Sequence, residues 1–237
     1  MGKDSDTSIP LYAQVANQLR FDIEHGKYAK GERIPTEKEL GQLYAVSRIT
    51  VRSALDELEK EHLLIRKQGK GTFIAREKFR RDISRGSSFT QICLANGQIP
   101  GAKVIKSVIE NADESDLAEL KLPEKSKVIV IERIRYADDI PVALEISRLP
   151  ERFAFLLNEN LNDASLISLL LEKYNISFTC TTKVLELVYA SYEIARYLSV
   201  ADCYPLISIY SLSCDTEGTP AHRSLQYVVG DKFKFFL

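Results

Sequence analysis

Apolar residues near the start of the chain recur at helical spacing. Between Pro10 and Gly26 an apolar residue stands at every fourth position: Leu11, Val15, Leu19 and Ile23. This period places the four side chains on one side of a helix, and a proline before and a glycine after are typical helix boundaries. The pattern therefore predicts an amphipathic helix over residues 10–26 with its apolar side against a core.

Two further helical patterns follow closely. Thr36, with Glu39 three residues later, has the spacing of a capping box, which predicts a helix over residues 36–44. Ser47 is an N-cap candidate for a longer helix over residues 47–60. The apolar residues of this longer helix form a single stripe: Val51, Ala54, Leu55 and Leu58. Both helices are therefore expected to pack on the same core as the first.

The charged residues of the longer helix are unevenly distributed. Arg48 and Arg52 lie one turn apart near its start, with Thr50 between them. Its far end is acidic, with Asp56, Glu57, Glu59 and Glu61. Only the first two turns can therefore approach the phosphates of a nucleic acid without electrostatic repulsion.

A basic turn follows this helix. Residues 63–65 and 72–74 are short strand candidates, and residues 66–71 between them are basic and contain two glycines. Taken singly, such a helix is commonly a solvated amphipathic helix and such a turn an ordinary hairpin. Their order over residues 36–74 predicts a winged helix-turn-helix, whose second helix enters the major groove of DNA while the hairpin forms the wing.

Three segments, residues 35–40, 46–55 and 68–73, resemble the signature of GntR-superfamily transcriptional regulators, within a match that covers residues 10–74. The resemblance implies DNA contacts from both helices and from the wing. The DNA-binding candidates are Thr36, Lys38, Ser47, Arg48, Thr50, Arg52, Gln68, Gly69, Lys70, Gly71 and Thr72. Two residues depart from the family pattern: Lys38 replaces the usual arginine and Ala45 the usual turn glycine. Because lysine lacks the planar fork of arginine, base reading at position 38 is expected to differ.

The pattern changes after residue 74. Residues 76–86 are charged and have no lasting period, which predicts a linker, and the polar residues 1–9 predict a disordered lead-in. Beyond the linker, helices are predicted over residues 89–96, 113–120, 165–174 and 192–198. Strands are predicted over residues 102–109, 127–136, 141–148, 179–189, 206–214 and 221–229. Adjacent hairpins indicate mainly antiparallel pairing, so residues 87–237 are predicted to form an α+β domain.

Charge and composition narrow the possible functions. The net charge of −1 combines 17 basic and 13 acidic residues up to residue 85 with 15 basic and 20 acidic residues after it. The positive first part is consistent with an approach to nucleic acid. No apolar run reaches membrane-spanning length and no signal peptide is recognised, so we expect a cytoplasmic protein. Without an export signal, Cys93, Cys180, Cys203 and Cys214 are expected to be reduced thiols. Because metal-ligand spacing is absent among them, we expect no metal and no cofactor.

Two arginines are the main candidates for chemistry in the second half. Arg133 and Arg135 are two positions apart in a predicted strand and so project from one face, where Glu145 of the next strand can join them. One interpretation is a surface ladder of ion pairs with Glu132 and Glu145. The other is a pocket for a phosphate or carboxylate. Ser165 could add its hydroxyl and helix amides to the same anion, or could serve only as a helix cap.

The second half resembles the UTRA effector domain, which marks the HutC subfamily of GntR regulators, on residues 89–90, 131–138, 141–145, 149–150 and 230–235. The resemblance implies a chorismate-lyase-like fold. In members that sense amino-sugar phosphates, it places two arginines and a serine on the phosphate. In the last hairpin Ser224 fits the family pattern, whereas His222 and Val228 replace a glutamate and a tyrosine. The ligand-binding candidates are Phe89, Thr90, Arg133, Arg135, Glu145, Ser165, His222 and Ser224.

Together, these resemblances imply a homodimeric repressor that binds near-palindromic operator DNA and is released by a small phosphorylated metabolite, such as a sugar or amino-sugar phosphate. A constitutive DNA-binding protein whose second domain only dimerises is an alternative. A chorismate-lyase-like enzyme fused to a DNA-binding domain is another. We expect no enzyme activity, because no paired base, nucleophile or metal set accompanies the glutamate and the arginines.

Overall fold

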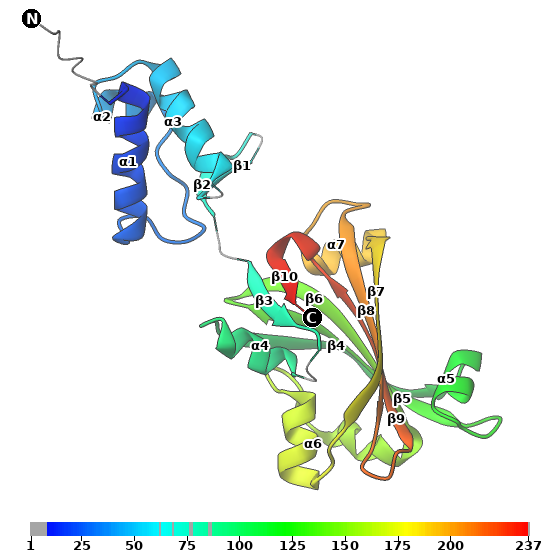
Figure 1. Cartoon of the computed structure of the whole chain (residues 1–237). Coiled ribbons are helices and arrows are strands. Elements are labelled where there is room, and N and C mark those ends of the chain that lie inside the picture. The colour runs from blue at the N-terminus through cyan, green and yellow to red at the C-terminus, as the bar shows by residue number, and fades with distance from the viewer. Residues whose placement is uncertain (1–8, 62, 68, 76–77, 85–86, 237) are drawn as a thin grey trace, which may run out of the picture. The chain divides into compact units, whose positions relative to one another are not determined.

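The chain folds into two compact units, and the second begins at Lys78 (Figure 1). The computed structural model describes residues 9–61, 63–67, 69–75, 78–84 and 87–236. Each unit has buried apolar clusters of its own. Within the described residues, no helix combines the length and the apolar character needed to cross a membrane.

The described part of the first unit consists of three helices and an antiparallel hairpin, each where the sequence predicts it. The elements are α1 (Leu11–Glu24), α2 (Glu37–Leu43), α3 (Arg48–Lys60), β1 (Leu64–Lys67) and β2 (Gly71–Ile74). Both predicted caps are present. The amide of Thr36 donates to the Glu39 carboxylate at 2.7 Å, and Ser47 Oγ accepts from the amide of Thr50 at 3.1 Å.

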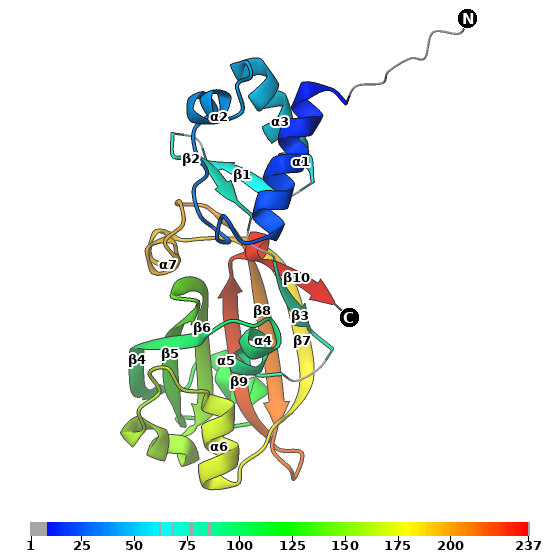
Figure 2. The ribbon, with the colours of Figure 1, turned by 90° about the vertical axis from the view of Figure 1, so that its left-hand side faces the viewer.

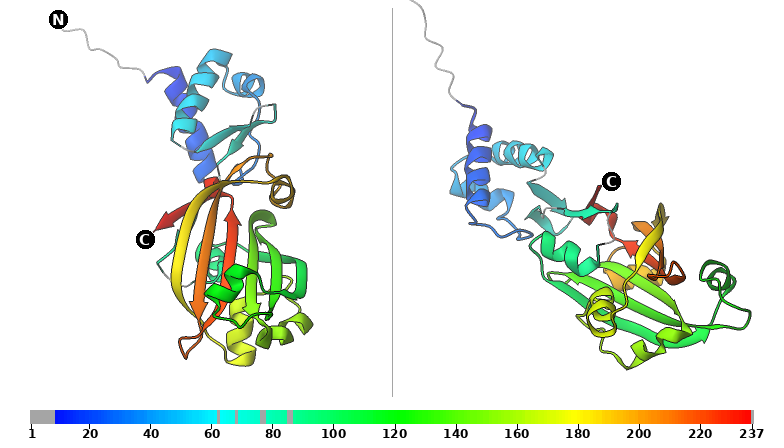
Figure 3. Two further views of the ribbon diagram at one scale, coloured as in Figure 1. Left: turned by 90° about the vertical axis from the view of Figure 1, so that its right-hand side faces the viewer. Right: turned by 60° about the horizontal axis from the view of Figure 1, so that its bottom comes forward.

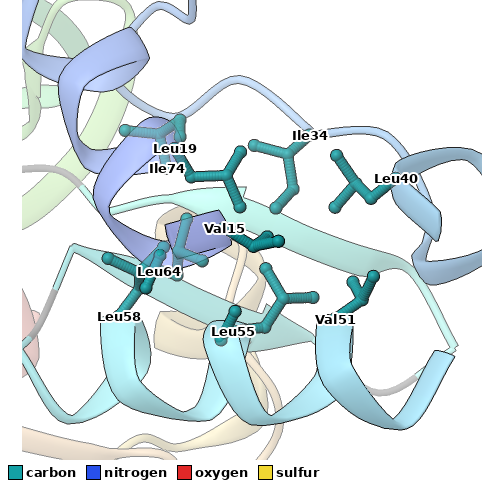
Figure 4. Close-up of a cluster of buried hydrophobic side chains, with 11 residues drawn as sticks. Val15, Leu19, Ile34, Leu40, Val51, Leu55, Leu58, Leu64 and Ile74 are labelled. Atoms are coloured by element: carbon teal, nitrogen blue, oxygen red, sulfur yellow. The ribbon is translucent and has the colours of Figure 1, made fainter. Parts of the chain in front are cut away.

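Apolar side chains from the helices and the hairpin meet in one core (Figure 4). Its buried members include Val15, Leu19, Ile34, Leu40, Val51, Leu55, Leu58, Leu64 and Ile74. Full burial of one such side chain stabilises a fold by about 1.5–3 kcal/mol. This core therefore fixes α3 against α1 and the hairpin, and leaves the opposite side of α3 in solvent.

The turn between α2 and α3 contains a residue in a costly conformation. Ala45 has a φ of 55°, in the left-handed region. There the Cβ atom crowds the following carbonyl oxygen, whereas glycine has no Cβ and enters the region freely. The alanine found where a turn glycine is usual therefore costs conformational energy.

The second unit is built on a six-stranded sheet in which every neighbouring pair is antiparallel. Its order is β4-β5-β6-β9-β8-β7. The strands are β4 (Pro100–Asn111), β5 (Lys127–Ala137), β6 (Ile140–Pro150), β7 (Thr179–Tyr189), β8 (Pro205–Cys214) and β9 (Pro220–Val228). The antiparallel α+β prediction is confirmed.

Helices cover both faces of this sheet. One face packs against α4 (Phe89–Ala95), the 3-10 helix η1 (Glu151–Asn158) and α6 (Leu166–Tyr174). The other packs against α5 (Glu114–Glu119) and α7 (Tyr192–Leu198). Figure 2 looks onto the side with α4 and α6, and the left view of Figure 3 onto the side with α5. The sequence did not predict η1.

One strand of a small second sheet lies within the range predicted to be a linker. Residues Phe79–Asp82 form β3, which pairs in parallel with β10 (Phe233–Phe236), and the short 3-10 helix η2 (Gly230–Lys232) precedes β10. These residues are therefore a strand of the second unit and not part of a linker. The sequence pattern missed the pair because each strand is only four residues long and its partner is distant along the chain.

The cysteine side chains that the structure describes are free thiols. Cys93 is buried in α4, Cys214 is half-buried at the end of β8, and Cys203 is exposed. The side chain of Cys180 lies outside the described residues.

We predict that Ala45→Gly raises the free energy of unfolding by about 1 kcal/mol, because it removes a Cβ atom from a left-handed residue. Ala13→Gly, inside α1, is the matched control and should lower it by about 0.5–1 kcal/mol. Urea denaturation of both variants measures the difference. Equal destabilisation by the two changes would show that the turn carries no conformational cost.

Candidate functional site

The start of α3 presents a set of exposed side chains. Arg48, Ile49 and Arg52 are exposed, and Thr50 is half-buried. Ile49 is 78% exposed, and an apolar side chain at this end of a recognition helix can contact a thymine methyl group. The sequence prediction missed Ile49, although its position on the side opposite Val51 was a usable signal.

Two of the DNA-binding candidates already serve their own helices. The hydroxyls of Thr36 and Ser47 cap α2 and α3. Capping places both residues beside helix N-terminal amides, which are favourable positions for a phosphate. Lys38 is exposed on α2, so its ammonium group is accessible.

Arg52 is held by a carboxylate of the neighbouring helix. Its Nε and Nη2 donate to the two carboxylate oxygens of Glu37 at 3.1 and 2.8 Å. The hydrogen bond from Arg52 lowers the pKa of Glu37. Since part of its charge is compensated in this way, Arg52 is less available to phosphates than Arg48.

The wing brings its glycine-rich turn into solvent. Gly69 and Lys70 are exposed, and Thr72 in β2 is half-buried. Gly71 has a φ of 112°, and a Cβ atom built there would lie 2.7 Å from Nε of Arg33. The positive φ favours a glycine at this position, whereas the exposed Arg33 side chain could move away from an added Cβ atom. Gln68, also a DNA-binding candidate, lies outside the described residues.

In the second unit, Arg133, Arg135 and Glu145 meet on one face of the sheet. The register places Arg133 opposite Glu145. Arg133 Nη2 lies 2.5 Å from Oε2 of Glu145, and Arg135 Nη1 lies 3.5 Å from the same oxygen. Both arginine side chains are at most 3% exposed, and Glu132 pairs with Lys106 instead. The cluster is therefore buried, and the surface-ladder interpretation is wrong.

Burial and charge act against each other in this cluster. Burial alone would raise the pKa of Glu145, but the positive charges of Arg133 and Arg135 outweigh it and lower that pKa to about 2. Burial lowers the pKa of Arg135 to about 10, against the opposing effect of Glu145. Glu145 and Arg135 are therefore both charged at neutral pH.

The cluster lines a cavity that also contains most of the other ligand-binding candidates. Phe89, Ser165, His222 and Ser224 line it together with the two arginines and Glu145. Thr90 is not among the lining residues, but its hydroxyl accepts a hydrogen bond of 3.4 Å from Arg135 Nη2. Residues separated by more than 130 positions in the sequence are thus brought to one site.

Ser165 caps α6 and lines the cavity at the same time. Its Oγ accepts from the amide of Ser168 at 3.2 Å. The carbonyl oxygen of Ala164, one residue earlier, accepts from Arg133 Nη1 at 3.0 Å. This bond ties the start of α6 to the arginine cluster. Ser165 is therefore a helix cap at the cavity wall, and its contact with an anion stays a prediction. On the α4 side, the Phe89 ring centre lies 4.6 Å from the Arg135 guanidinium carbon.

His222 is a neutral member of the cavity wall. Burial lowers its pKa to about 4, although the negative charge of Glu145 opposes the shift. Its Nε2 lies 3.1 Å from Ser147 Oγ, and its ring stacks on Phe178 at 5.5 Å between centres. His222 can therefore offer a polar nitrogen but no charge at neutral pH.

Sequence reasoning missed several residues of the cavity. Arg81 on β3 and Lys183 on β7 both line it, as do Ser211, Ser213 and Gln226. The β8 and β9 residues could have been found from their phase, since they alternate with apolar residues on strands that face a core. Arg81 could not, because its strand was assigned to the linker.

A winged helix joined to a domain with a charged internal cavity defines a class of protein: a DNA-binding transcription regulator with a separate sensing domain. Comparison with known proteins supports this class. Residues 11–74 match the bacterial regulatory proteins of the gntR family, and residues 95–234 match the UTRA domain. The chain belongs to the GntR family, in its UTRA-containing branch. It is therefore a transcriptional regulator and not an enzyme.

Similarity to individual proteins extends over almost the whole chain. The chain is 31% identical to the HTH-type transcriptional repressor NagR of Bacillus subtilis over 236 residues, 99% of this chain and 97% of NagR. It is 32% identical over 216 residues, 90% of this chain and 88% of the relative, to the "Probable fructoselysine utilization operon transcriptional repressor" of Escherichia coli. The crystal structure of PhnF from Mycobacterium smegmatis superposes with a TM-score of 0.68 at 26% identity, covering 94% of this chain and 97% of PhnF.

The buried His222 predicts a dependence of stability on pH. Because its pKa is about 4 in the folded protein and about 6.5 in the unfolded chain, the unfolded chain binds the extra proton first as the pH falls. Stability should therefore decrease from pH 6.5 toward pH 4, by about 2 kcal/mol at pH 5. His222→Gln should remove this part of the dependence, and His25→Gln, at the exposed end of α1, should not. Urea denaturation at pH 7 and pH 5 measures both, and equal slopes for wild type and His222→Gln would contradict the assignment.

Proposed function

We propose that the chain is a repressor that acts as a homodimer, binds a near-palindromic operator and is released by a phosphorylated sugar derivative. The two winged helices of the dimer would enter successive major grooves through α3, with the wings beside them. Its place of action would be the cytoplasm, where the operator is found.

The observation that carries the choice of ligand is the charge of the cavity. Three buried arginines, Arg81, Arg133 and Arg135, line the cavity with one described carboxylate, Glu145, and Lys183 adds a further basic side chain, so basic groups outnumber acidic ones in the wall. A phosphate monoester carries close to two negative charges at neutral pH. Arginine is also the side chain best suited to bind its oxygens in pairs. The position of Ser165 at the N-terminus of α6 adds a favourable helix end for the same anion.

The rest of the cavity wall is suited to a hydroxylated ligand. Serine residues recur around it: Ser87, Ser88, Ser165, Ser211, Ser213 and Ser224. Neutral His222 and Gln226 add further polar groups without charge. Hydroxyl and amide groups pair with sugar hydroxyls at little electrostatic cost. One relative is named for the utilization of fructoselysine, itself a sugar derivative.

Release follows if the ligand binds more tightly to a dimer geometry that does not fit the operator half-sites. A tenfold preference at each site corresponds to about 1.4 kcal/mol, so two sites would weaken operator binding about a hundredfold. A constitutive DNA-binding protein would show no such coupling, and this is the observation that separates the two functions.

Ligand binding is tested by thermal unfolding with sugar phosphates, amino-sugar phosphates and the same sugars without phosphate. A ligand at about a hundred times its Kd adds about 2.7 kcal/mol of stability. We expect stabilisation by phosphorylated compounds only, lost in Arg135→Gln and kept in Arg196→Gln, an exposed arginine on α7. Absence of stabilisation by every compound, with DNA binding intact, would favour the constitutive alternative.

DNA contacts are tested with an operator selected from a pool of random duplexes. Arg48→Ala should weaken binding by about 1–3 kcal/mol if the arginine contacts a base. If it contacts only a phosphate, the slope of log affinity against log salt concentration should become shallower by about 1. Arg52→Ala should have a smaller effect, because Glu37 already compensates its charge. Fluorescence anisotropy at several salt concentrations measures both variants. A larger loss for Arg52→Ala would show that its ion pair opens on DNA.

A further inference from the structure

The segment that precedes α2 runs antiparallel to β2 and carries an arginine that is not among the DNA-binding candidates. Arg33 pairs with Phe73 of β2 in an antiparallel bridge. Next to this bridge, the amide of Ile34 donates to the carbonyl oxygen of Thr72 at 3.0 Å. Backbone bonds therefore attach Arg33 to the wing, on the side of β2 opposite β1.

The side chain of Arg33 lies on the outer face of the wing. Its neighbour Ile34 is 2% exposed and belongs to the core of the first unit. Because successive side chains point to opposite faces, Arg33 points away from that core, and it is exposed. The register places Lys67 of β1 opposite Gly71, two residues before Phe73. Arg33, Gly71 and Lys67 therefore share one face.

Gly71 brings the two basic side chains of this face close to each other. A Cβ atom built on Gly71 would lie 2.7 Å from Nε of Arg33 and 3.3 Å from its guanidinium carbon, so the guanidinium lies over the glycine. On the β1 side, Lys67 is exposed, and its Nζ lies 4.7 Å from the centre of the Phe73 ring. Two positive groups thus flank a residue that has no side chain.

Neither of these cations forms an ion pair within the described part of the chain. The neighbouring arginines differ in this respect. Arg52 pairs with Glu37, and Arg66 pairs with two carboxylates of α3. The Glu39 carboxylate accepts the capping hydrogen bonds of α2 instead. Arg33 and Lys67 therefore repel each other without a compensating negative charge from the described residues.

Both cations border a recess at the surface that several DNA-binding candidates share. The charged residues Glu37 and Arg66 also line it, but each is already paired. The charge that remains available there is positive. The DNA-binding candidates in its wall are Thr36, Gly69, Gly71 and Thr72.

A phosphate of the DNA backbone fits this arrangement. It carries one negative charge and exposed oxygens that a guanidinium and an ammonium group can bind together. We propose that Arg33 and Lys67 bind one backbone phosphate of the operator beside the wing. This inference rests on the DNA-binding part of the proposed function and adds a contact outside α3. Because a phosphate contact carries no base information, it positions the protein on DNA and does not select a sequence.

The test compares the full-length wild type with Arg33→Gln, Lys67→Gln and the double variant. Fluorescence anisotropy measures binding to a selected operator duplex and to a duplex of unrelated sequence at several salt concentrations. Arg33→Lys keeps the positive charge. Lys60→Gln, at the exposed end of α3, is the matched control because it removes one charge elsewhere in the first unit. All positions are exposed, so the unfolding temperature of each variant should stay close to that of the wild type.

A shared phosphate predicts a specific change in salt dependence. In the double variant, the slope of log affinity against log salt concentration should become shallower by about 1. From about 50 to about 200 mM salt, the loss of affinity should then be roughly 3–4-fold smaller than in the wild type. Each single variant should show part of this change, equally on both duplexes. Arg33→Lys and Lys60→Gln should keep the slope of the wild type.

Three results would contradict the proposal while the wild type still binds DNA. An unchanged slope in the double variant would show that neither cation meets a phosphate. A slope shallower by about 2 would show that they bind separate phosphates. A loss confined to the operator duplex would show that one of them contacts a base. Failure of the wild type to bind any duplex would refute the proposed function itself.

Discussion

The structure of the second unit depends on the attraction between Glu145 and the two arginines of β5, Arg133 and Arg135. In a buried setting, a carboxylate between two guanidiniums is stabilised strongly enough to stay ionised, as its lowered pKa indicates. Without Glu145, two like charges would face each other in the interior of the sheet. With it, the cluster keeps a net positive charge that an anion can complete.

This cluster makes one part of a sheet face polar, although the rest of that face packs in apolar clusters. The arginines hold the start of α6 through the carbonyl of Ala164 and lie against Phe89 of α4. The helices that close the cavity are thus attached to the charged groups at its centre. The residues proposed to bind the ligand therefore also hold the fold together, which limits the substitutions that the cavity can accept.

The first unit could be predicted almost completely from sequence, because its contacts are local and its signals are periodic. The capping pairs Thr36–Glu39 and Ser47–Thr50 mark both helix starts within a few residues. In the second unit, two-residue alternation predicted the shared face of Arg133, Arg135 and Glu145. It could not reveal Arg81, whose strand pairs with residues far along the chain, nor the ion pair of Arg52 with Glu37, which depends on how two helices cross.

The parallel pairing of β3 with β10 has a consequence for the order in which the protein is made. About 150 residues separate the two strands, which corresponds to roughly 8–30 s of synthesis at the rates of translation. The first unit, whose core is complete by Ile74, can fold during this interval. The part of the cavity wall that contains Arg81 cannot form until β10 has been synthesised, because β3 pairs with β10. On a nascent chain, the ability to sense a ligand therefore develops after the DNA-binding fold.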